Sequence, residues 1–253
     1  MIDLHCHILP GLDDGSSSAE ESLAMARLAL EDGIHTIVAT PHTSDGVYDV
    51  PLAEIIRSVG SFRELLRSSG LALKICVGAD IHLCPGMTEK IRKGELGTLN
   101  DTGKYVLLEL PPQTLPSGVR EEIFSLKMAG ITPIITHPER HPAILRDMNL
   151  LYDFIVMGAL SQITAMSLTG EFGQGVRGCS QELLKHRLVH VIATDAHSAE
   201  NRPPLLSRAA HEAAELTGSD SLAASLVEGL PAKILAGEPV EIPEPMRVKR
   251  SSF

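Results

Sequence analysis

Tryptophan is absent from this sequence of 253 residues, and aromatic residues make up only 3% of it. Hydrophobic residues nevertheless account for 43%, so aliphatic side chains must fill the core. Branched aliphatic residues of this kind dominate the interior of parallel α/β barrels. A chain of this length suits one large α/β domain better than two small ones.

Positive charge is scarce as well, because 22 Lys and Arg stand against 32 Asp and Glu, for a formal net charge of −10. A surface that binds nucleic acid needs a basic stripe, so we expect no nucleic-acid partner. An acidic substrate remains compatible with the composition, since bound metal ions can reverse the local field.

The cysteines form no C-x-x-C pair and no spacing typical of secreted disulfide-rich proteins; they are Cys6, Cys76, Cys84 and Cys179. No basic or apolar leader precedes the first predicted strand, and no apolar run is long enough to span a membrane. We therefore expect reduced thiols, no membrane insertion and a cytoplasmic location. The oligomeric state does not follow from the sequence.

Several catalytic motifs are missing. No cysteine is followed six residues later by Arg, as a cysteine-based phosphatase requires, and neither a P-loop nor G-x-S-x-G is present. Residues 173–178 match G-x-G-x-x-G, but they follow a polar loop rather than a strand end, so the match is weak support for dinucleotide binding.

Short apolar runs alternate with amphipathic segments, which predicts repeated βα units with parallel strands. The predicted strands are 2–7, 36–40, 73–78, 105–110, 132–136, 160–164 and 188–194. Predicted helices run from a capping box at Ser18 to Gly33, and over about 52–69, 120–129, 204–217 and 222–228. We expect an irregular loop over 166–178 and a Pro-rich, then basic tail over 239–253.

Ionisable side chains recur where these strands end, a placement typical of the active-site face of a parallel barrel. They are His5, His7, Asp13, Asp14, His42, Asp80, Glu109, His137, Asp195 and His197. An open sheet would gather only those near its switch point, whereas a barrel brings all of them together. One His or Asp at a strand end is more often a turn or capping residue, but burying so many without a cation would be costly. The pattern predicts a polynuclear metal site.

The i, i+2 spacing places His5 and His7 on one face of their strand, and it does the same for Asp195 and His197 where strand geometry persists. Imidazole and carboxylate ligands together suit Zn, Mn or Fe, and the lack of thiolates argues against a structural zinc site. Cys6 alternates to the opposite side and is expected to be a packed thiol. No role is assigned to the remaining histidines, His35, His82, His141, His186, His190 and His211.

Four segments resemble the signature motifs of the PHP (polymerase and histidinol phosphatase) superfamily. They are Asp3-Leu-His5-Cys-His7, Thr40-Pro-His42, Thr136-His137-Pro-Glu-Arg140 and Thr194-Asp195-Ala-His197. Within that superfamily, 9–15, 137–140, 162–173 and 231–237 are most similar to the bacterial protein-tyrosine phosphatases of capsule and exopolysaccharide operons. The resemblance extends from Met1 to about Pro239, which suggests a phosphatase domain over 1–238 and a tail over 239–253.

This resemblance implies a single-domain, distorted (β/α)7 TIM-like barrel with three divalent metal ions, usually manganese, with iron and zinc as alternatives. By position, the first ion would be held by His5, His7, Asp80 and Asp195, the second by Asp80, Glu109 and His137, and the third by Asp14, His42 and His197. The bridging position is usually Glu, so Asp80 is one methylene shorter, and Asp13 competes with Asp14 as the loop ligand. Arg140 and Arg202 would bind the phosphoryl oxygens, although without the resemblance each would be assigned to a surface ion pair.

The implied reaction is hydrolysis of phosphotyrosine by a water that two metal ions share, which loses a proton near neutral pH and attacks phosphorus in line. The implied substrate is the Tyr-rich tail of a membrane-bound bacterial tyrosine kinase that controls polysaccharide export. Two alternatives stay open: a small-molecule phosphatase, such as one for histidinol phosphate, and a PHP-like domain that binds metal without turnover.

Overall fold

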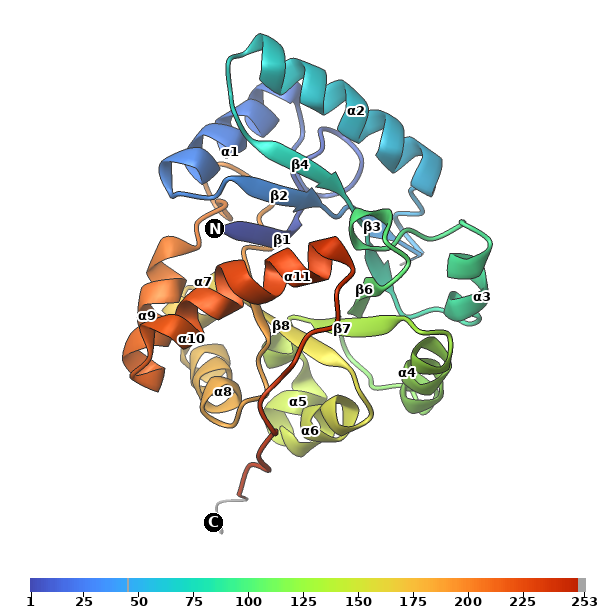
Figure 1. Cartoon of the computed structure of the whole chain (residues 1–253), viewed down its shortest axis with the longest axis vertical. Coiled ribbons are helices and arrows are strands. Elements are labelled where there is room, and N and C mark those ends of the chain that lie inside the picture. The colour runs from blue at the N-terminus through green and yellow to red at the C-terminus, as the bar shows by residue number, and fades with distance from the viewer. Residues whose placement is uncertain (45, 250–253) are drawn as a thin grey trace.

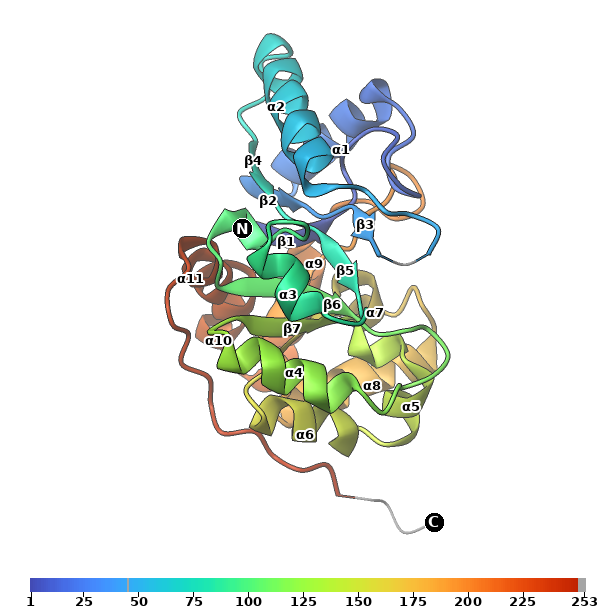
Figure 2. The ribbon, with the colours of Figure 1, turned by 90° about the vertical axis from the view of Figure 1, so that its right-hand side faces the viewer.

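Parallel strands form the centre of the molecule, and helices surround them (Figures 1 and 2). The computed structural model describes residues 1–44 and 46–249. Within these residues the strands are β1 Ile2–Cys6, β2 Thr36–Ala39, β3 His42–Thr43, β4 Lys74–Val77, β5 Asp80–His82, β6 Tyr105–Glu109, β7 Thr132–Thr136, β8 Leu160–Thr164 and β9 Val191–Ala193. They form one sheet in the order β1-β2-β4 and another in the order β3-β5-β6-β7-β8-β9, and every pairing is parallel.

The two sheets are joined to each other in two places. At one, the chain passes from β4 into β5 through Gly78, where a Cβ would lie 2.6 Å from a Val38 methyl group. At the other, Cys6 and Ala196 form a parallel bridge, and the His7 N–H donates to the Ala196 carbonyl at 2.8 Å. The expected single α/β domain with parallel strands is therefore confirmed.

Two of the strands, β3 and β5, were not predicted from the sequence. Pro41 has no N–H to donate and interrupts the ladder between β2 and β3, while Gly78 lies between β4 and β5. Each predicted strand in this part of the chain, 36–40 and 73–78, is followed by a second short strand that belongs to the other sheet. This offset leads Asp80 to begin β5 rather than to follow the end of β4.

The helices pack outside the strands, with α1 and α2 over the first sheet and α4, α5, α6 and α8 beside the second (Figures 1 and 2). Their bounds are α1 Ala19–Glu31, α2 Leu52–Ser68, α3 Met87–Arg92, α4 Val119–Met128, α5 Pro142–Arg146, α6 Asn149–Val156, α7 Ala165–Thr169, α8 Gln174–Lys185, α9 Ser207–Thr217, α10 Asp220–Ala224 and α11 Leu230–Ala236. Short 3-10 turns cover Leu99–Asp101 and Pro138–Arg140, and a π-helical turn covers Ser225–Gly229. The predicted capping box is confirmed, since the Ser18 side chain accepts from the Glu21 N–H at 3.2 Å.

The expectation of an irregular loop over 166–178 is wrong. Helix α7 occupies its first part and the beginning of α8 its last part. Gly170 and Gly173, with φ of 99° and 93°, lie in the turn between them. Glycines at 175 and 178 lower the helix propensity of α8, so tertiary packing of residues such as Cys179 and Leu183 has to stabilise it.

Along several strands the same face changes from apolar to polar toward the carboxyl end. In β6 the alternate residues Tyr105, Leu107 and Glu109 share one face, and in β8 the residues Leu160 and Gln162 do so. The apolar members join Ile234 and Leu235 of α11 in one buried cluster. The carboxyl ends of the strands are thereby left to polar side chains.

Residues 239–249 of the C-terminal tail lie along the outside of the molecule rather than apart from it (Figure 1). The Val248 N–H and carbonyl both bond to the Asn149 side chain at 3.0 Å, and the Met246 N–H donates to the His186 carbonyl at 2.9 Å. Residues 250–253 of the predicted tail lie outside the described residues, and the domain boundary at 238 stays a prediction. No helix in the described part of the chain is both long and apolar enough to cross a membrane.

Candidate metal centre

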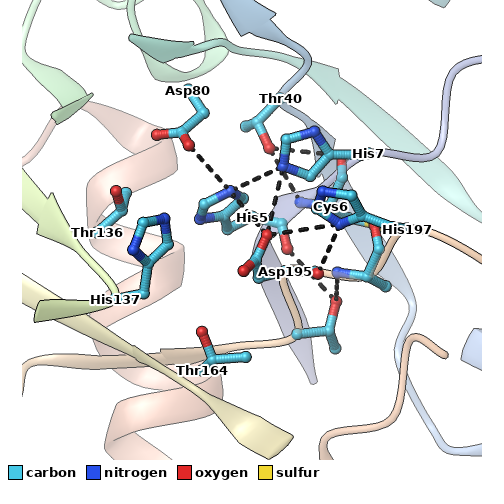
Figure 3. A network of polar contacts seen from close by, with 12 residues as sticks. His5, Cys6, His7, Thr40, Asp80, Thr136, His137, Thr164, Asp195 and His197 are labelled. Atoms are coloured by element: carbon cyan, nitrogen blue, oxygen red, sulfur yellow. Dashed lines mark hydrogen bonds and ion pairs between the residues drawn. The ribbon is translucent and has the colours of Figure 1, made fainter. Parts of the chain in front are cut away.

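The carboxyl ends of β1 and β7, the start of β5 and the segment after β9 bring their polar side chains to one place (Figure 3). Within the described residues, three overlapping groups of side chains have ligand atoms that all lie within 4.8 Å of one another. These groups are His5, His7 and Asp80; then His42, Asp80 and Glu109; and then His7, Asp14, His42 and His197. The clustering predicted from the strand ends is therefore present.

The first group matches the residues expected around the first ion. His5 Nε2 lies 3.0 Å from His7 Nε2 and 3.5 Å from Asp80 Oδ2. Asp195 lies outside the group by the 4.8 Å measure, but its Oδ1 is 3.4 Å from both imidazole Nε2 atoms. All four residues expected at this position thus surround one small volume.

The second group differs from the expectation in one member. His42 Nδ1 lies 3.5 Å from both Asp80 Oδ2 and Glu109 Oε2. His137, which was expected there, belongs to none of the three groups, although its Nε2 is 3.5 Å from Glu109 Oε1. His42 therefore lies between two groups, whereas His137 flanks one of them.

The geometry separates the adjacent carboxylates Asp13 and Asp14. Asp14 Oδ1 is 3.5 Å from His197 Nε2 and 3.6 Å from His42 Nε2. Asp13 instead accepts from His7 Nδ1 at 2.6 Å and from the His42 backbone N–H at 2.9 Å. Asp14 therefore faces the centre, and Asp13 lies behind His7.

Hydrogen bonds at Nδ1 orient three of the imidazoles so that Nε2 faces the centre. His5 donates from Nδ1 to Gln162 Oε1 at 2.9 Å, and His7 donates to Asp13. His197 donates from Nδ1 to the Asp195 carbonyl at 2.9 Å. Each bond leaves Nε2 directed at the centre, as outer hydrogen bonds do for histidine ligands of metals.

The protonation of these imidazoles depends on their burial. Burial lowers the pKa of His5 to about 4 and that of His197 to about 2, so both are neutral at pH 7, the form that binds cations. Burial also disfavours the charged form of His7, but hydrogen bonds to Asp13 and Asp195 outweigh it and raise the pKa of His7 to about 10.

Asp80 provides the test of whether a cation fits this site. The side chain is 0% exposed, and neither of its oxygens has a hydrogen-bond partner among the described residues. Burial and the nearby Glu109 carboxylate raise the pKa of Asp80 well above its usual range. A buried carboxylate without a partner is costly, and a divalent cation would satisfy both oxygens. The donor set is one of imidazole and carboxylate, so the residues fit Mn, Fe or Zn.

Two of the surrounding residues have an unusual backbone. His137 has φ of 35° and Asp195 has φ of 51°, both in the left-handed region that disfavours residues with a Cβ. Backbone strain of this kind clusters at functional sites, where the surrounding structure enforces it.

Both predicted arginines lie at the same centre, beside a cavity of about 280 Å³. Arg202 Nη2 lies 2.7 Å from Asp195 Oδ2, and Arg140 makes a close ion pair with the same oxygen. Although burial alone would raise it, Arg140, the neighbouring His5 and His7 imidazoles and Arg202 hold the pKa of Asp195 well below its usual range. Leu110 and Pro112 form part of the apolar wall of the cavity.

Several residues that support the centre were not predicted from the sequence. Asp3 accepts from the Thr194 N–H at 2.9 Å and from the His5 N–H at 3.3 Å, which ties β1 to the segment that carries Asp195. His82, to which no role was assigned, lies beside the centre, with its Nδ1 3.3 Å from Glu109 Oε2. The spacing of Asp80 and His82 could have indicated this, because i and i+2 residues share a strand face.

Comparison with known proteins agrees with this geometry. The family model for capsular polysaccharide synthesis, CpsB/CapC, matches residues 1–236. The tyrosine-protein phosphatase YwqE of Bacillus subtilis is 38% identical over 202 residues, which cover 80% of this chain and 79% of that protein. The putative tyrosine-protein phosphatase CapC of Staphylococcus aureus is 36% identical over 208 residues, which cover 82% of this chain and 81% of that protein.

Solved structures give the same result. One of them comes from work on YwqE of Bacillus subtilis and CpsB of Streptococcus pneumoniae, which are described there as unique metal-dependent tyrosine phosphatases. It matches with a TM-score of 0.95 and 35% identity, over 99% of this chain and 100% of that chain. The lactonase Lmo2620 of Listeria monocytogenes, at 12% identity and a TM-score of 0.59, shares only the fold. The chain belongs to the CpsB/CapC family of capsular polysaccharide synthesis proteins.

Proposed function

We propose that this protein is a metal-dependent protein-tyrosine phosphatase that acts on the phosphotyrosine tail of a bacterial tyrosine kinase in capsule or exopolysaccharide synthesis. The observation that carries the proposal is the convergence of three overlapping potential metal-binding groups at one centre, beside a cavity that two arginines also line. The names of the relatives, tyrosine-protein phosphatases, support the choice of substrate.

In the proposed site, three divalent ions, manganese first with iron and zinc as alternatives, are held by nine residues. They are His5, His7, Asp14, His42, Asp80, Glu109, His137, Asp195 and His197. Bound ions supply Lewis acidity, which lowers the pKa of water and neutralises charge on the phosphoryl oxygens. Asp80 lies in two of the three groups, which supports its expected role as the bridging carboxylate.

The arginines supply the remaining charge. Arg202 Nε is buried and has no hydrogen-bond partner among the described residues, so it retains a free donor. Arg140 and Arg202 both line the cavity, where their planar guanidinium groups can bind phosphoryl oxygens and stabilise charge that develops in the transition state. In the proposed complex the phenyl ring of the substrate lies against Leu110 and Pro112.

The two alternative functions are less well supported. The named relatives are tyrosine phosphatases rather than histidinol phosphatases. All nine candidate ligands are present and surround the site, which argues against a domain that has lost turnover. A cytoplasmic location and a catalytic domain over 1–238 are further parts of the proposal, and the four buried, free cysteines are compatible with a reducing compartment.

Initial rates on matched substrates test the proposed function. After reconstitution with manganese, we expect hydrolysis of a phosphotyrosine peptide to exceed that of the corresponding phosphoserine peptide and of histidinol phosphate. Faster turnover of histidinol phosphate would favour the small-molecule alternative. No turnover of any of the three by a protein that binds the metal would favour the non-catalytic one.

Thiol chemistry is expected to play no part. Cys6 lies between His5 and His7 but is 0% exposed, and burial raises its pKa well above its usual range, so no thiolate forms near pH 7. Cys6→Ser should therefore retain the wild-type rate within about an order of magnitude. A loss of that size is what one changed buried contact can cause when the catalytic groups stay in place. Steady-state kinetics, with circular dichroism and metal analysis as controls, measure this. Complete loss of activity in a folded, metal-loaded variant would point to catalysis by the thiol.

A further inference from the structure

Phe172 lies in the turn between α7 and α8, beside both arginines of the site. Its ring centroid is 5.3 Å from Arg140 Cζ and 5.9 Å from Arg202 Cζ. A guanidinium within about 6 Å of a ring centroid is attracted by the negative face of the ring. One phenyl ring therefore contacts both cations that are proposed to bind the phosphoryl group.

The other partner of these cations is Asp195. Its Oδ2 forms ion pairs with both Arg140 and Arg202, and its backbone carbonyl accepts from Arg202 Nη2 at 2.8 Å. The two guanidinium groups thus contact a carboxylate and an aromatic ring that come from distant parts of the chain. With these contacts in place, few orientations remain for either group.

The turn that carries the ring is itself held in place. Gly170 and Gly173 take φ of 99° and 93°, which allows the tight path around Phe172. The neighbouring Glu171 accepts from Arg208 Nη1 at 2.7 Å. Phe172 is not among the described residues that line the cavity, whereas both arginines are. The ring is therefore placed to act on the arginines rather than on the substrate.

We propose that Phe172 is a positioning residue that fixes the guanidinium planes of Arg140 and Arg202 so that their free N–H groups face the phosphoryl group. This inference rests on the proposed function of the two arginines. Contact with a ring restricts a planar guanidinium without using its N–H donors, which therefore stay available for phosphate.

Phe172→Leu removes the ring face but keeps an apolar side chain of similar size. We expect it to lower kcat and to weaken inhibition by inorganic phosphate, each by about 5- to 30-fold, the effect of losing one or two cation–π contacts. Metal content should not change. Phe172→Tyr keeps the ring and should retain most of the rate. If Phe172 served only in packing, the Tyr variant would not be expected to be more active than the Leu variant.

The chain offers a matched control in Tyr152, whose ring centroid lies 4.4 Å from Arg247 Cζ and which belongs neither to the cavity lining nor to the potential metal-binding groups. Tyr152→Leu removes an aromatic–arginine contact of the same kind and should leave both rate and phosphate inhibition unchanged. A double-mutant cycle gives a second readout. In an Arg202→Lys background, Phe172→Leu should have a smaller effect than in the wild type, because one of the two oriented groups has already been lost.

The outcomes separate this inference from the proposed function. If the wild type hydrolyses the phosphotyrosine peptide and a folded Phe172→Leu keeps the normal rate and phosphate inhibition, the positioning role is overturned while the phosphatase assignment stands. If the wild type does not hydrolyse the peptide, calorimetric binding of inorganic phosphate to the manganese-loaded protein still tests the role of Phe172. Should Phe172→Leu fold poorly, Phe172→Met removes the same ring with a more adaptable side chain, and equal activity of Met and Tyr variants would overturn the proposal.

Discussion

Replacement of Asp80 by Ala is expected to abolish metal-dependent activity. The metal-free variant should lose no more stability, relative to the metal-free wild type, than a small buried substitution ordinarily causes. The Asp80 carboxylate is fully buried with no hydrogen-bond partner among the described residues, so its removal orphans no donor. The Asp80 carboxylate belongs to two of the potential metal-binding groups, so its loss should reduce the rate more than about 100-fold. A loss of about 100-fold is the upper range for residues that only support metal ligands. Metal analysis, steady-state kinetics and thermal melting with and without manganese measure the three effects.

Asp3 offers a matched comparison, because it is equally buried but its carboxylate is satisfied. Asp3→Ala would orphan the backbone N–H groups of Thr194 and His5, at about 1–3 kcal/mol each. We therefore expect the metal-free Asp3→Ala protein to melt at a lower temperature than metal-free Asp80→Ala. The wild type should be stabilised by manganese much more than Asp80→Ala.

Chelation of the wild type should likewise abolish hydrolysis, and Mn²⁺ should restore it better than Mg²⁺, which prefers an octahedron of oxygen ligands. Full activity of a protein shown to contain no metal would contradict the whole mechanism. An Asp80→Ala variant that is destabilised as much as Asp3→Ala would contradict the conclusion that Asp80 has no hydrogen-bond partner in the metal-free protein.

Arg140→Ala and Arg202→Ala should each lower kcat by about 10²–10³ while metal content stays normal. Losing one preorganised donor to developing charge typically has an effect of this size. Both arginines contact Asp195 in the structure, so their removal leaves this carboxylate no less available to a cation. Lys should substitute only in part, because it offers a point charge in place of a planar fork. Kinetics on a phosphotyrosine peptide beside metal analysis test both statements.

Arg120 is the control for these variants, since it also lies between a carboxylate and a ring. Its Nη2 is 2.8 Å from Asp153 Oδ2, and its Cζ is 5.6 Å from the centroid of the Phe154 ring. These contacts join α4 to α6, and none of the three residues lines the cavity. Arg120→Ala should therefore keep the wild-type rate. If Arg140→Ala and Arg202→Ala behave like Arg120→Ala, the arginines are ordinary ion-pair residues and the phosphatase assignment loses two of its supports.

Much of the fold could be predicted because its signals are local. The seven predicted strand segments all contain strands, and the capping box at Ser18 is present as expected. The errors occur where local preference and packing disagree. Glycines at 175 and 178 concealed α8, and Pro41 and Gly78 concealed that the chain moves between sheets at β3 and β5.

The sequence by itself determined which residues gather at the carboxyl ends of the strands, because parallel strands that alternate with helices must bring those ends to one face. Only the tertiary structure decided how they are used. It placed Asp14 toward the centre and Asp13 behind His7, brought His42 into the group of Asp80 and Glu109, and paired Phe172 with the two arginines. Orientation depends on hydrogen bonds and ring contacts between residues far apart in the chain, such as His5 with Gln162, and no local pattern encodes those contacts.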